Sequence, residues 1–374
     1  MTMHRARPPG LYDVARLAGV SHQTVSRVIN DHPNVRPETK ERVKAAIAEL
    51  GYRRNAAARA LVTRRSNTIG VITSSSPLWG PIGTLVAVEH AARKAGYYVN
   101  VAGMASIEPV AVDAALRRFV DQGVDGIVVV APEAALSHIA DPFVTDVPVV
   151  LIAAGADPAP GVQIAAIDQE GGARLAVRHL IELGHRDIAH VSGPEPWFDA
   201  TARLLGWRRE LAAHGLRPGL LRSGDWTAAS GHRIGRQLLR RASLPSAVFV
   251  ANDLMALGLL KALHDANIAV PEQVSVVGFD DMPGADYFEP ALTTVRQDLD
   301  SLGRLCMDIL LSALNGTPAP PPVVPATLVV RESAGPPAPP PGGGGGGGPP
   351  GPGGGGGRAP GGGGGGGGGL GPRA

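Results

Sequence analysis

The sequence predicts an α/β protein built from a helix-turn-helix head, two doubly wound parallel-sheet lobes and a disordered C-terminal tail. From Thr68 onward, apolar strand patterns alternate with amphipathic helical patterns, which is typical of parallel sheets with right-handed crossovers. Before that point the patterns are those of short helices in a basic segment. The last 40 residues are dominated by glycine and proline. At 374 residues, the chain is long enough for several domains with separate cores.

Charge is distributed unevenly along the chain. Residues 1–65 contain 13 lysines and arginines against 5 aspartates and glutamates, whereas the remaining residues contain 22 against 28. A basic head on a mildly acidic body predicts a polyanionic partner for the head alone.

The head is predicted to contain three helices. Residues 11–18 form the first, Gly19 supplies a tight turn, and Ser21 is a favourable N-cap for the second. A third helix follows Pro37, with apolar residues at helical spacing. Two short helices joined by a glycine turn and backed by a third make a helix-turn-helix, whose second helix enters the major groove of DNA. The residues expected to point inward from the first helix are Val14, Leu17 and Ala18.

The second helix, "GVSHQTVSRVIN" at residues 19–30, has an apolar side and a hydrogen-bonding side. Val25 and Val28 lie on the first, and five polar residues without a carboxylate span about 140° of the second. Gln can pair with adenine and Arg with guanine, and Ser21 and Thr24 are placed for phosphate contacts. A small helical bundle with a polar exterior is the alternative. The five residues are His22, Gln23, Ser26, Arg27 and Asn30.

The body, residues 67–334, is predicted to form two lobes with a cleft, because so long a run of βα units is natural for two sheets and large for one. Continuous apolar runs are typical of strands that are buried on both faces of a parallel sheet. The expected strands are 68–73, 97–102, 126–131, 148–153, 187–192, 246–251 and 274–279. The expected helices are 81–95, 110–122, 169–183, 198–213, 227–241 and 252–265.

Polar side chains collect where several of these strands end. Ser74, Asn252 and Asp280 each follow or end an apolar strand pattern, and ligands of such sheets bind beyond the carboxyl ends of the strands. With Arg203 and Trp226, these residues predict a pocket for a sugar, because an indole ring offers a flat apolar face and the polar groups can bind hydroxyls. Each cluster alone could instead be a strand-end turn or a helix cap.

The motifs of the head resemble the LacI family of transcriptional regulators. "LYDVARLAGVSHQTVSRVIN" and "VRPETKERVKAAIAELGYRRNAAARAL" are similar to that family's DNA-binding head, here 1–54, and its hinge helix and linker, here 55–66. The resemblance implies that the hinge helix folds when paired with its dimer mate on DNA, where Leu61 would enter between base pairs from the minor groove. A flexible basic linker is the alternative. Arg36 stands where the family often has an N-capping serine. The residues implied to contact DNA are Tyr12, Ser21, His22, Gln23, Thr24, Ser26, Arg27, Asn30, Asn55, Ala58 and Leu61.

The body resembles the periplasmic-binding-protein-like core of the same family. "VANDLMALGLLKAL", "VSVVGFDDMPGADYFEPALTTVRQDLDSLG", "GDWTAASG" and "ARLLGW" carry this resemblance, which extends over about residues 10–334. It breaks at Ala153 and Ala154, where an aspartate is implied, and at Val130, where an asparagine is implied. The residues implied to bind the effector are Ser74, Arg203, Trp226, Asn252, Asp280 and Gln297.

The resemblance implies a cytoplasmic, dimeric repressor that leaves a pseudo-palindromic operator when a sugar inducer closes the cleft and separates the hinges. A regulator that binds DNA when loaded with a purine or another non-sugar metabolite is the alternative within the family. The body alone would also suit a transport-type sugar-binding protein without a DNA function, although the basic head and the lack of an export signal argue against it. A carbohydrate-processing enzyme is a third possibility.

Several chemistries find no support in the sequence. It has no GxSxG elbow, HExxH pair, P-loop or metal-ligand cluster, so we expect no catalytic residues, cofactor or metal. The single cysteine, Cys306, excludes a disulfide within the chain. No apolar run approaches membrane-spanning length, so we expect no membrane partner. The tail, residues 335–374, cannot bury apolar area and has no leucine heptad for a tetramerisation helix, so we expect a homodimer.

Overall fold

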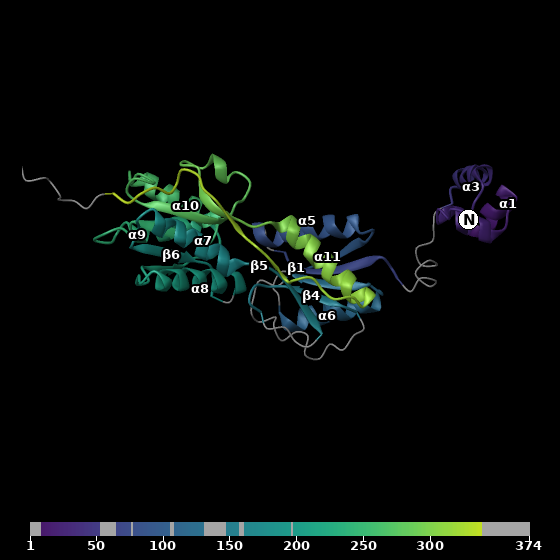
Figure 1. Ribbon diagram of the computed structural model, residues 1–374, viewed down its shortest axis with the longest axis horizontal. Helices are drawn as coiled ribbons and strands as arrows, with labels where there is room; N and C mark the ends of the chain where they lie inside the picture. The colour runs from purple at the N-terminus through teal and green to yellow at the C-terminus, as the bar shows by residue number, and fades with distance from the viewer. Residues whose placement is uncertain are drawn as a thin grey trace, which may run out of the picture. The chain divides into compact units, whose positions relative to one another are not determined.

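The structure is a computed structural model of the chain. It describes residues 9–52, 65–75, 78–104, 108–130, 147–156, 161–195 and 197–338. These residues form a three-helix head and a two-lobed α/β core, as predicted (Figure 1). The predicted hinge residues Asn55, Ala58 and Leu61 lie outside the described residues, as does the predicted tail beyond Ala338.

The head packs three helices around one small apolar core. Gly19 ends the first helix with φ of 63°, a left-handed conformation that glycine adopts without strain. Ser21 Oγ accepts a 3.1 Å hydrogen bond from the backbone N–H of Thr24, which confirms the predicted N-cap. Arg36 precedes the third helix and provides no side-chain cap. The helices are α1 (Leu11–Ala18), α2 (His22–Ile29) and α3 (Pro37–Leu50).

The core of the head differs from the prediction at one position. Val14 and Ala18 are buried as expected, but Leu17 is 45% exposed, so the prediction that it points inward is wrong. Ala15 takes the inward position instead. Helix α1 packs against both α2 and α3, and the small side chains of Ala15 and Ala18 let the helices approach closely, which leaves the larger Leu17 on the flank.

The first lobe of the core is a six-stranded sheet in the order β11-β5-β4-β3-β1-β2, with all neighbours parallel. Helices α5 and α11 pack together on one face and α6 covers the other (Figure 1). The strands are β1 (Thr68–Ser74), β2 (Tyr98–Met104), β3 (Gly126–Val130), β4 (Val149–Ile152), β5 (Val162–Ile167) and β11 (Val323–Val324). The helices are α5 (Trp79–Lys94), α6 (Pro109–Asp121) and α11 (Leu299–Asn315).

The second lobe is a sheet in the order β12-β10-β9-β8-β6-β7, in which only β12 runs antiparallel to its neighbour. Helices α7 and α8 cover one face, and α9 and α10 cover the other. The strands are β6 (Ile188–Ser192), β7 (Leu221–Ser223), β8 (Ala247–Val250), β9 (Ser275–Asp280), β10 (Thr293–Arg296) and β12 (Thr327–Val329). The helices are α7 (Gln169–Glu182), α8 (Phe198–Ala213), α9 (Ala228–Leu238), α10 (Asp253–Asp265) and the short 3-10 helix η2 (Ala285–Tyr287).

The chain crosses between the lobes three times, after β5, after β10 and after β11. The seven expected strands and six expected helices are present, although some ends move by a few residues. Five strands (β5, β7, β10, β11 and β12) and helix α11 were not among the expected elements. Most of these strands are short or lie at sheet edges, so they lack the long apolar run that marks a central strand.

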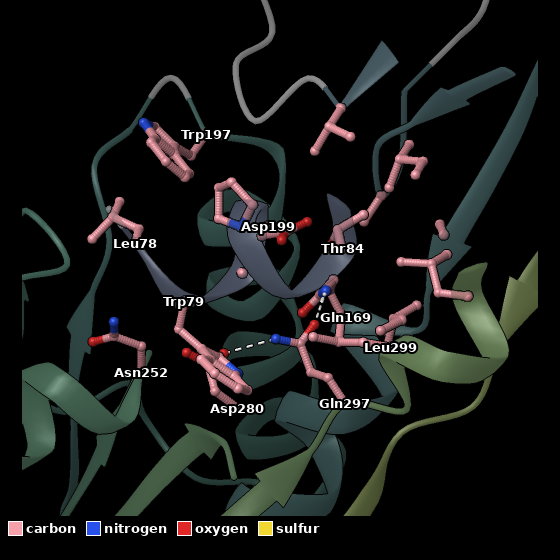
Figure 2. A pocket seen from close by; sticks show the side chains of 18 of the residues that line it. Leu78, Trp79, Thr84, Gln169, Trp197, Asp199, Asn252, Asp280, Gln297 and Leu299 are labelled. Carbon is pink, nitrogen blue, oxygen red and sulfur yellow. Dashed lines mark hydrogen bonds between the residues drawn. The ribbon is translucent and has the colours of Figure 1, made fainter. Parts of the chain in front are cut away.

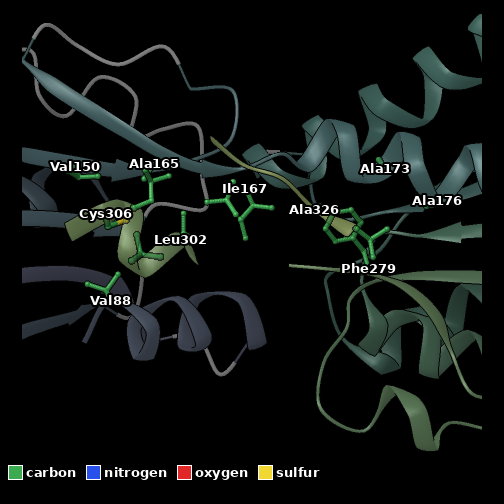
Figure 3. Packing of buried hydrophobic residues seen from close by; sticks show 14 of the residues in the cluster. Val88, Val150, Ala165, Ile167, Ala173, Ala176, Phe279, Leu302, Cys306 and Ala326 are labelled. Atoms are coloured by element: carbon green, nitrogen blue, oxygen red, sulfur yellow. The ribbon is translucent and has the colours of Figure 1, made fainter. Parts of the chain in front are cut away.

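One apolar cluster continues from the first lobe into the second (Figure 3). Val88 and Cys306 belong to its part in the first lobe, and Ala173 and Phe279 to its part in the second. Ala326, in the last crossing segment, is part of the same cluster. The last crossing segment is therefore packed into the core through Ala326.

The C-terminal boundary of the core lies slightly beyond the predicted residue 334. His185 Nε2 donates a 2.8 Å hydrogen bond to the carbonyl oxygen of Gly335, and the Gly335 N–H donates to Ser275 Oγ at 3.0 Å. The compact unit ends at Pro337. These polar contacts fix a segment whose glycine and proline content made it look like tail.

Candidate functional site

The exposed face of α2 is the candidate nucleic-acid interface. Val25 and Val28 are buried against the rest of the head, so the opposite face of the helix is turned outward. The ring of Tyr12, which is 68% exposed on α1, lies 4.9 Å from the ring of His22. The described members of the predicted DNA-contacting set are all at least partly exposed: Tyr12, Ser21, His22, Gln23, Thr24, Ser26, Arg27 and Asn30.

A second candidate site is a cavity between the two lobes of the core. The predicted residues Arg203, Trp226, Asn252, Asp280 and Gln297 all line it (Figure 2). Each comes from a different helix, strand end or connecting segment, and the fold of the second lobe brings them together. The structure therefore brings these five side chains together around one cavity.

Ser74, the sixth predicted residue, does not line this cavity. Its hydroxyl at the end of β1 is buried, and no described residue forms a hydrogen bond with it. Leu78 and Trp79, where α5 begins, line the cavity instead. The strand-end position of Ser74 therefore did not predict which side chains form the wall.

Arg203 is the centre of the polar network of the cavity and is only 3% exposed. Its Nε donates to Gln169 Oε1 at 2.9 Å, and its Nη1 donates to the carbonyl oxygen of Ala251. The guanidinium lies 3.5 Å from Asp280 Oδ1 and 3.7 Å from Asp199 Oδ2. It also lies 3.8 Å from the centre of the Phe279 ring, in a cation–π contact. These contacts hold the planar charge in one orientation.

A chain of side-chain hydrogen bonds joins Asp280 to Arg203 through two amides. Gln297 Nε2 donates to Asp280 Oδ1 at 2.7 Å, and Gln169 Nε2 donates to Gln297 Oε1 at 2.7 Å (Figure 2). Burial raises the pKa of Asp280 to about 6, and the charge of Arg203 opposes that rise. The network therefore fixes the orientations of both glutamine amides.

Trp226 forms one wall of the cavity and is held in an unusual backbone conformation. Its φ is 71°, a value that non-glycine residues seldom adopt. Asn252 Nδ2 donates to its carbonyl oxygen at 3.1 Å, while Asn252 Oδ1 caps α10. The indole N–H of Trp226 is buried and has no hydrogen-bond partner among the described residues. The centre of the Trp197 ring lies 5.4 Å from the centre of the Trp226 ring. The cavity thus has two neighbouring aromatic faces.

The lining residues that were not predicted from the sequence include the polar or aromatic side chains of Trp79, Gln169, Trp197 and Asp199. The signal for Asp199 was present, because it lies one helical turn before Arg203 in a helix that was expected. The Asp199 side chain is 39% exposed; desolvation by the surrounding protein raises its pKa, and the charge of Arg203 opposes that rise. Trp79 could not be placed from its position in the sequence, because the wall that it joins is formed by non-local contacts.

Two carboxylates near the cavity do not line it and are paired with neighbouring side chains or backbone groups. Asp253 accepts hydrogen bonds from the Thr294 hydroxyl at 2.6 Å and from the backbone N–H of Met282 at 2.9 Å. Burial and the nearby charge of Asp280 raise the pKa of Asp253. Asp281 pairs with Arg296 and Arg331. These contacts fix the loop that follows β9 and so the position of Asp280.

Within the described residues, no group of three or more His, Cys, Asp or Glu side chains is arranged to hold a metal ion. In the same part of the chain, no helix has the length and apolar character needed to cross a bilayer.

Comparison with known proteins finds a family match for the head and another for part of the core. Residues 10–55 match the family "Bacterial regulatory proteins, lacI family", and residues 177–334 match the family "Periplasmic binding protein-like domain". The lactose operon repressor of Escherichia coli (strain K12) is 38% identical over 311 residues, which cover 83% of this chain and 86% of the repressor.

Two solved structures are similar over most of the chain. A lac repressor dimer bound to operator and the anti-inducer ONPF has a TM-score of 0.78 and 35% identity, covering 88% of this chain and 100% of that one. A complex of the transcriptional regulator CelR with cellobiose has a TM-score of 0.63 and 35% identity, covering 87% and 100%. With a regulatory head, a binding-protein-like core and this degree of identity, the chain belongs to the lacI family of bacterial transcriptional regulators.

Proposed function

We propose that the protein is a repressor that binds a pseudo-palindromic DNA operator as a homodimer and is released from it by a sugar. The observation that carries this proposal is the cavity, in which two tryptophan faces adjoin the Arg203 network. A similar lac repressor has been solved as a dimer on operator, and a similar CelR has been solved with cellobiose.

The proposed DNA contacts divide into reading and positioning groups. Gln23 and Arg27 project from the exposed face of α2 and have the donor geometry that reads adenine and guanine edges. Ser21 and Thr24 lie at the start of the same helix, where hydroxyls and backbone N–H groups bind phosphate and fix the register. Asn55, Ala58 and Leu61 are assigned to the hinge, which would contact the minor groove when paired with its dimer mate.

The proposed sugar contacts follow from the chemistry of the cavity. An indole face packs on the apolar C–H face of a pyranose, and Trp226 and Trp197 supply two such faces. The carboxylate of Asp199 opens toward the cavity and accepts hydroxyl hydrogen bonds. The buried indole N–H of Trp226 lacks an acceptor among the described residues, and a ligand oxygen would supply one.

The DNA function is tested by selecting operator sequences from a random duplex pool and measuring their affinity by fluorescence anisotropy. We expect Gln23→Ala to weaken operator binding by about 1–3 kcal/mol and to relax the preference at one base pair. Gln237→Ala, an exposed glutamine on α9, is the matched control and leaves the affinity unchanged. If no duplex sequence is enriched, the chain is a sugar-binding protein without a DNA function and the proposal fails.

The sugar function is tested by titrating pyranosides and nucleobases against the protein–operator complex. We expect a sugar to lower operator affinity, and Asp199→Asn to remove that effect while operator binding without sugar is retained. A ligand that instead raises operator affinity, a purine for example, would replace the inducer mechanism by corepression. The sign of the shift decides between the two, because an inducer prefers the state that binds operator weakly and a corepressor prefers the state that binds it tightly.

A further inference from the structure

Three chain segments connect the two lobes, and backbone hydrogen bonds join two of the three pairs that they form. The segment after β5 is bonded to the segment after β11, where the Asp168 N–H donates to the carbonyl oxygen of Val324 at 2.8 Å. Strand β10, which precedes the second segment, pairs with β12, which follows the third. Among the described residues, the segments after β5 and after β10 are joined by a hydrogen bond between two side chains, Gln169 and Gln297.

The hydrogen bonds around these two amides run in one direction (Figure 2). Arg203 Nε donates to Gln169 Oε1 at 2.9 Å, and Gln169 Nε2 donates to Gln297 Oε1 at 2.7 Å. Gln297 Nε2 donates in turn to Asp280 Oδ1 at 2.7 Å. A guanidinium only donates and a carboxylate only accepts, so neither amide can turn over without losing the hydrogen bonds at both of its ends.

The amide contact fixes the start of α11 relative to the start of α7. Gln169 is the first residue of α7, in the second lobe, and is 4% exposed. Gln297 lies two residues before α11, and the residue that follows it, Asp298, caps this helix by accepting a 2.8 Å hydrogen bond from the Ser301 N–H. A buried hydrogen bond is costly to leave unmade. A displacement of the Gln169 amide therefore either breaks the bond at a cost in free energy or moves the first turn of α11 with it.

We propose that Gln169 is a positioning residue for the coupling between ligand and operator, because it links Arg203 through Gln297 to the start of α11. The inference rests on the proposed function and deepens it by naming the side chain through which an occupied cavity acts on the first lobe. A ligand oxygen that accepts from Arg203 Nε competes with Gln169 for the same donor. A ligand hydroxyl that donates to Asp280 competes with Gln297 for the same acceptor. Occupancy of the cavity then changes the position of the amide link, and hence of α11.

The experiment measures the operator affinity of the full-length protein by fluorescence anisotropy, without sugar and with saturating sugar. Gln169→Glu retains an acceptor for Arg203 but replaces the donor to Gln297 by an oxygen, so it breaks the link between the two glutamines. We expect the factor by which saturating sugar weakens operator binding to fall about fivefold or more. Because the sugar is saturating, a lower sugar affinity alone leaves this factor unchanged. Gln169→Met, which is uncharged and of similar length, is expected to have the same effect, and thermal melting monitors folding in both variants.

A second measurement follows the start of α11 without sugar or DNA. The Leu302 N–H donates to the carbonyl oxygen of Asp298 in the first turn of this helix, and we expect its hydrogen exchange to be about fivefold faster in both Gln169 variants. Gln273→Glu is the matched control, because it makes the same substitution at a glutamine of the second lobe whose Oε1 accepts from the Ala269 N–H outside this network. It leaves both the coupling factor and the exchange rate unchanged.

The outcomes separate this inference from the function on which it rests. If saturating sugar does not change the operator affinity of the unmodified protein, the proposed function fails, and this inference fails with it. If sugar does weaken operator binding but the coupling factor is the same in the Gln169 variants, the inference alone is overturned, and Gln169 only fills the wall of the cavity. Unchanged exchange at Leu302 would also overturn it, because the amide link would then not position α11.

Discussion

Arg65 Nη2 donates a 3.0 Å hydrogen bond to Oδ1 of Asn315, the last residue of α11. The same nitrogen donates to the carbonyl oxygen of Leu314 at 3.2 Å. The first turns of α11 line the cavity through Leu299 and Leu302. One helix of 17 residues, about 25 Å long, thus joins the cavity to Arg65, near the end of the predicted hinge and linker.

This contact predicts a role for Asn315 in the coupling between sugar and operator. We expect Asn315→Ala to reduce the factor by which sugar weakens operator binding by about threefold or more, because it removes one of the two hydrogen bonds that link α11 to Arg65 and so weakens transmission of movement between them. Sugar affinity without DNA should change less than twofold. Operator affinities with and without sugar provide the measurement. Asn100→Ala breaks a comparable surface hydrogen bond, to Gln122, and is the control; equal loss of coupling in both variants would exclude the proposed transmission.

Gly193 sets the position of Trp226. A Cβ atom at Gly193 would lie 2.2 Å from the indole ring, so Gly193→Ala must displace that ring. We expect sugar affinity to fall about tenfold or more, since the stacking face moves, while operator binding without sugar is retained. Gly10→Ala, whose new Cβ makes only ordinary contacts, should leave sugar affinity unchanged. Unchanged sugar affinity in Gly193→Ala would mean that Trp226 is not a contact surface.

The uncapped start of α3 predicts a stabilising substitution. Arg36 occupies the N-cap position without a side-chain hydrogen bond to the helix. Arg36→Ser would supply that bond and is expected to stabilise α3 by about 1 kcal/mol. Hydrogen exchange of the α3 amides should slow by about fivefold. Arg36→Ala removes the same charge without adding a cap, so equal slowing in both variants would show that capping is not the cause.

Buried His190 predicts a loss of stability in acid. Its Nδ1 donates to the carbonyl oxygen of Phe249 at 2.9 Å, and its ring stacks on Phe249 and Trp207. Burial lowers its pKa from 6.5 to about 4. Between these values the unfolded chain binds more protons than the folded chain, so stability is fully present above pH 6.5 and declines as the pH falls toward 4.

Protonation of His190 is expected to lower the free energy of unfolding by about 2 kcal/mol between about pH 7.5 and about pH 5. Urea denaturation at the two pH values measures it. His190→Phe retains the stacking and removes the titration, so its stability should fall less over the same interval. His179 and His185, whose pKa values burial also lowers, leave a residual slope. The same slope in both proteins would refute the assignment to His190.

The predictions from sequence succeeded where the determining interactions are local. Ser21 caps α2 through the Thr24 amide three residues away, and Gly19 makes the turn before it. They failed where packing partners are distant in sequence. Leu17 is exposed because α2 and α3 approach α1 over alanines, and Ser74 misses the cavity because the start of α5 forms the wall.

The amino-acid pattern by itself determined the three-helix head, the two lobes built from βα units, and the polar residues at strand ends. It did so because helical and strand periodicity record which side chains are buried. Only tertiary structure decided that the chain crosses between lobes three times, that α11 returns to the first lobe, and that Gln169 meets Gln297. Those outcomes depend on pairing between strands as distant in sequence as those of Ala166 and Val323, and no local pattern encodes that choice.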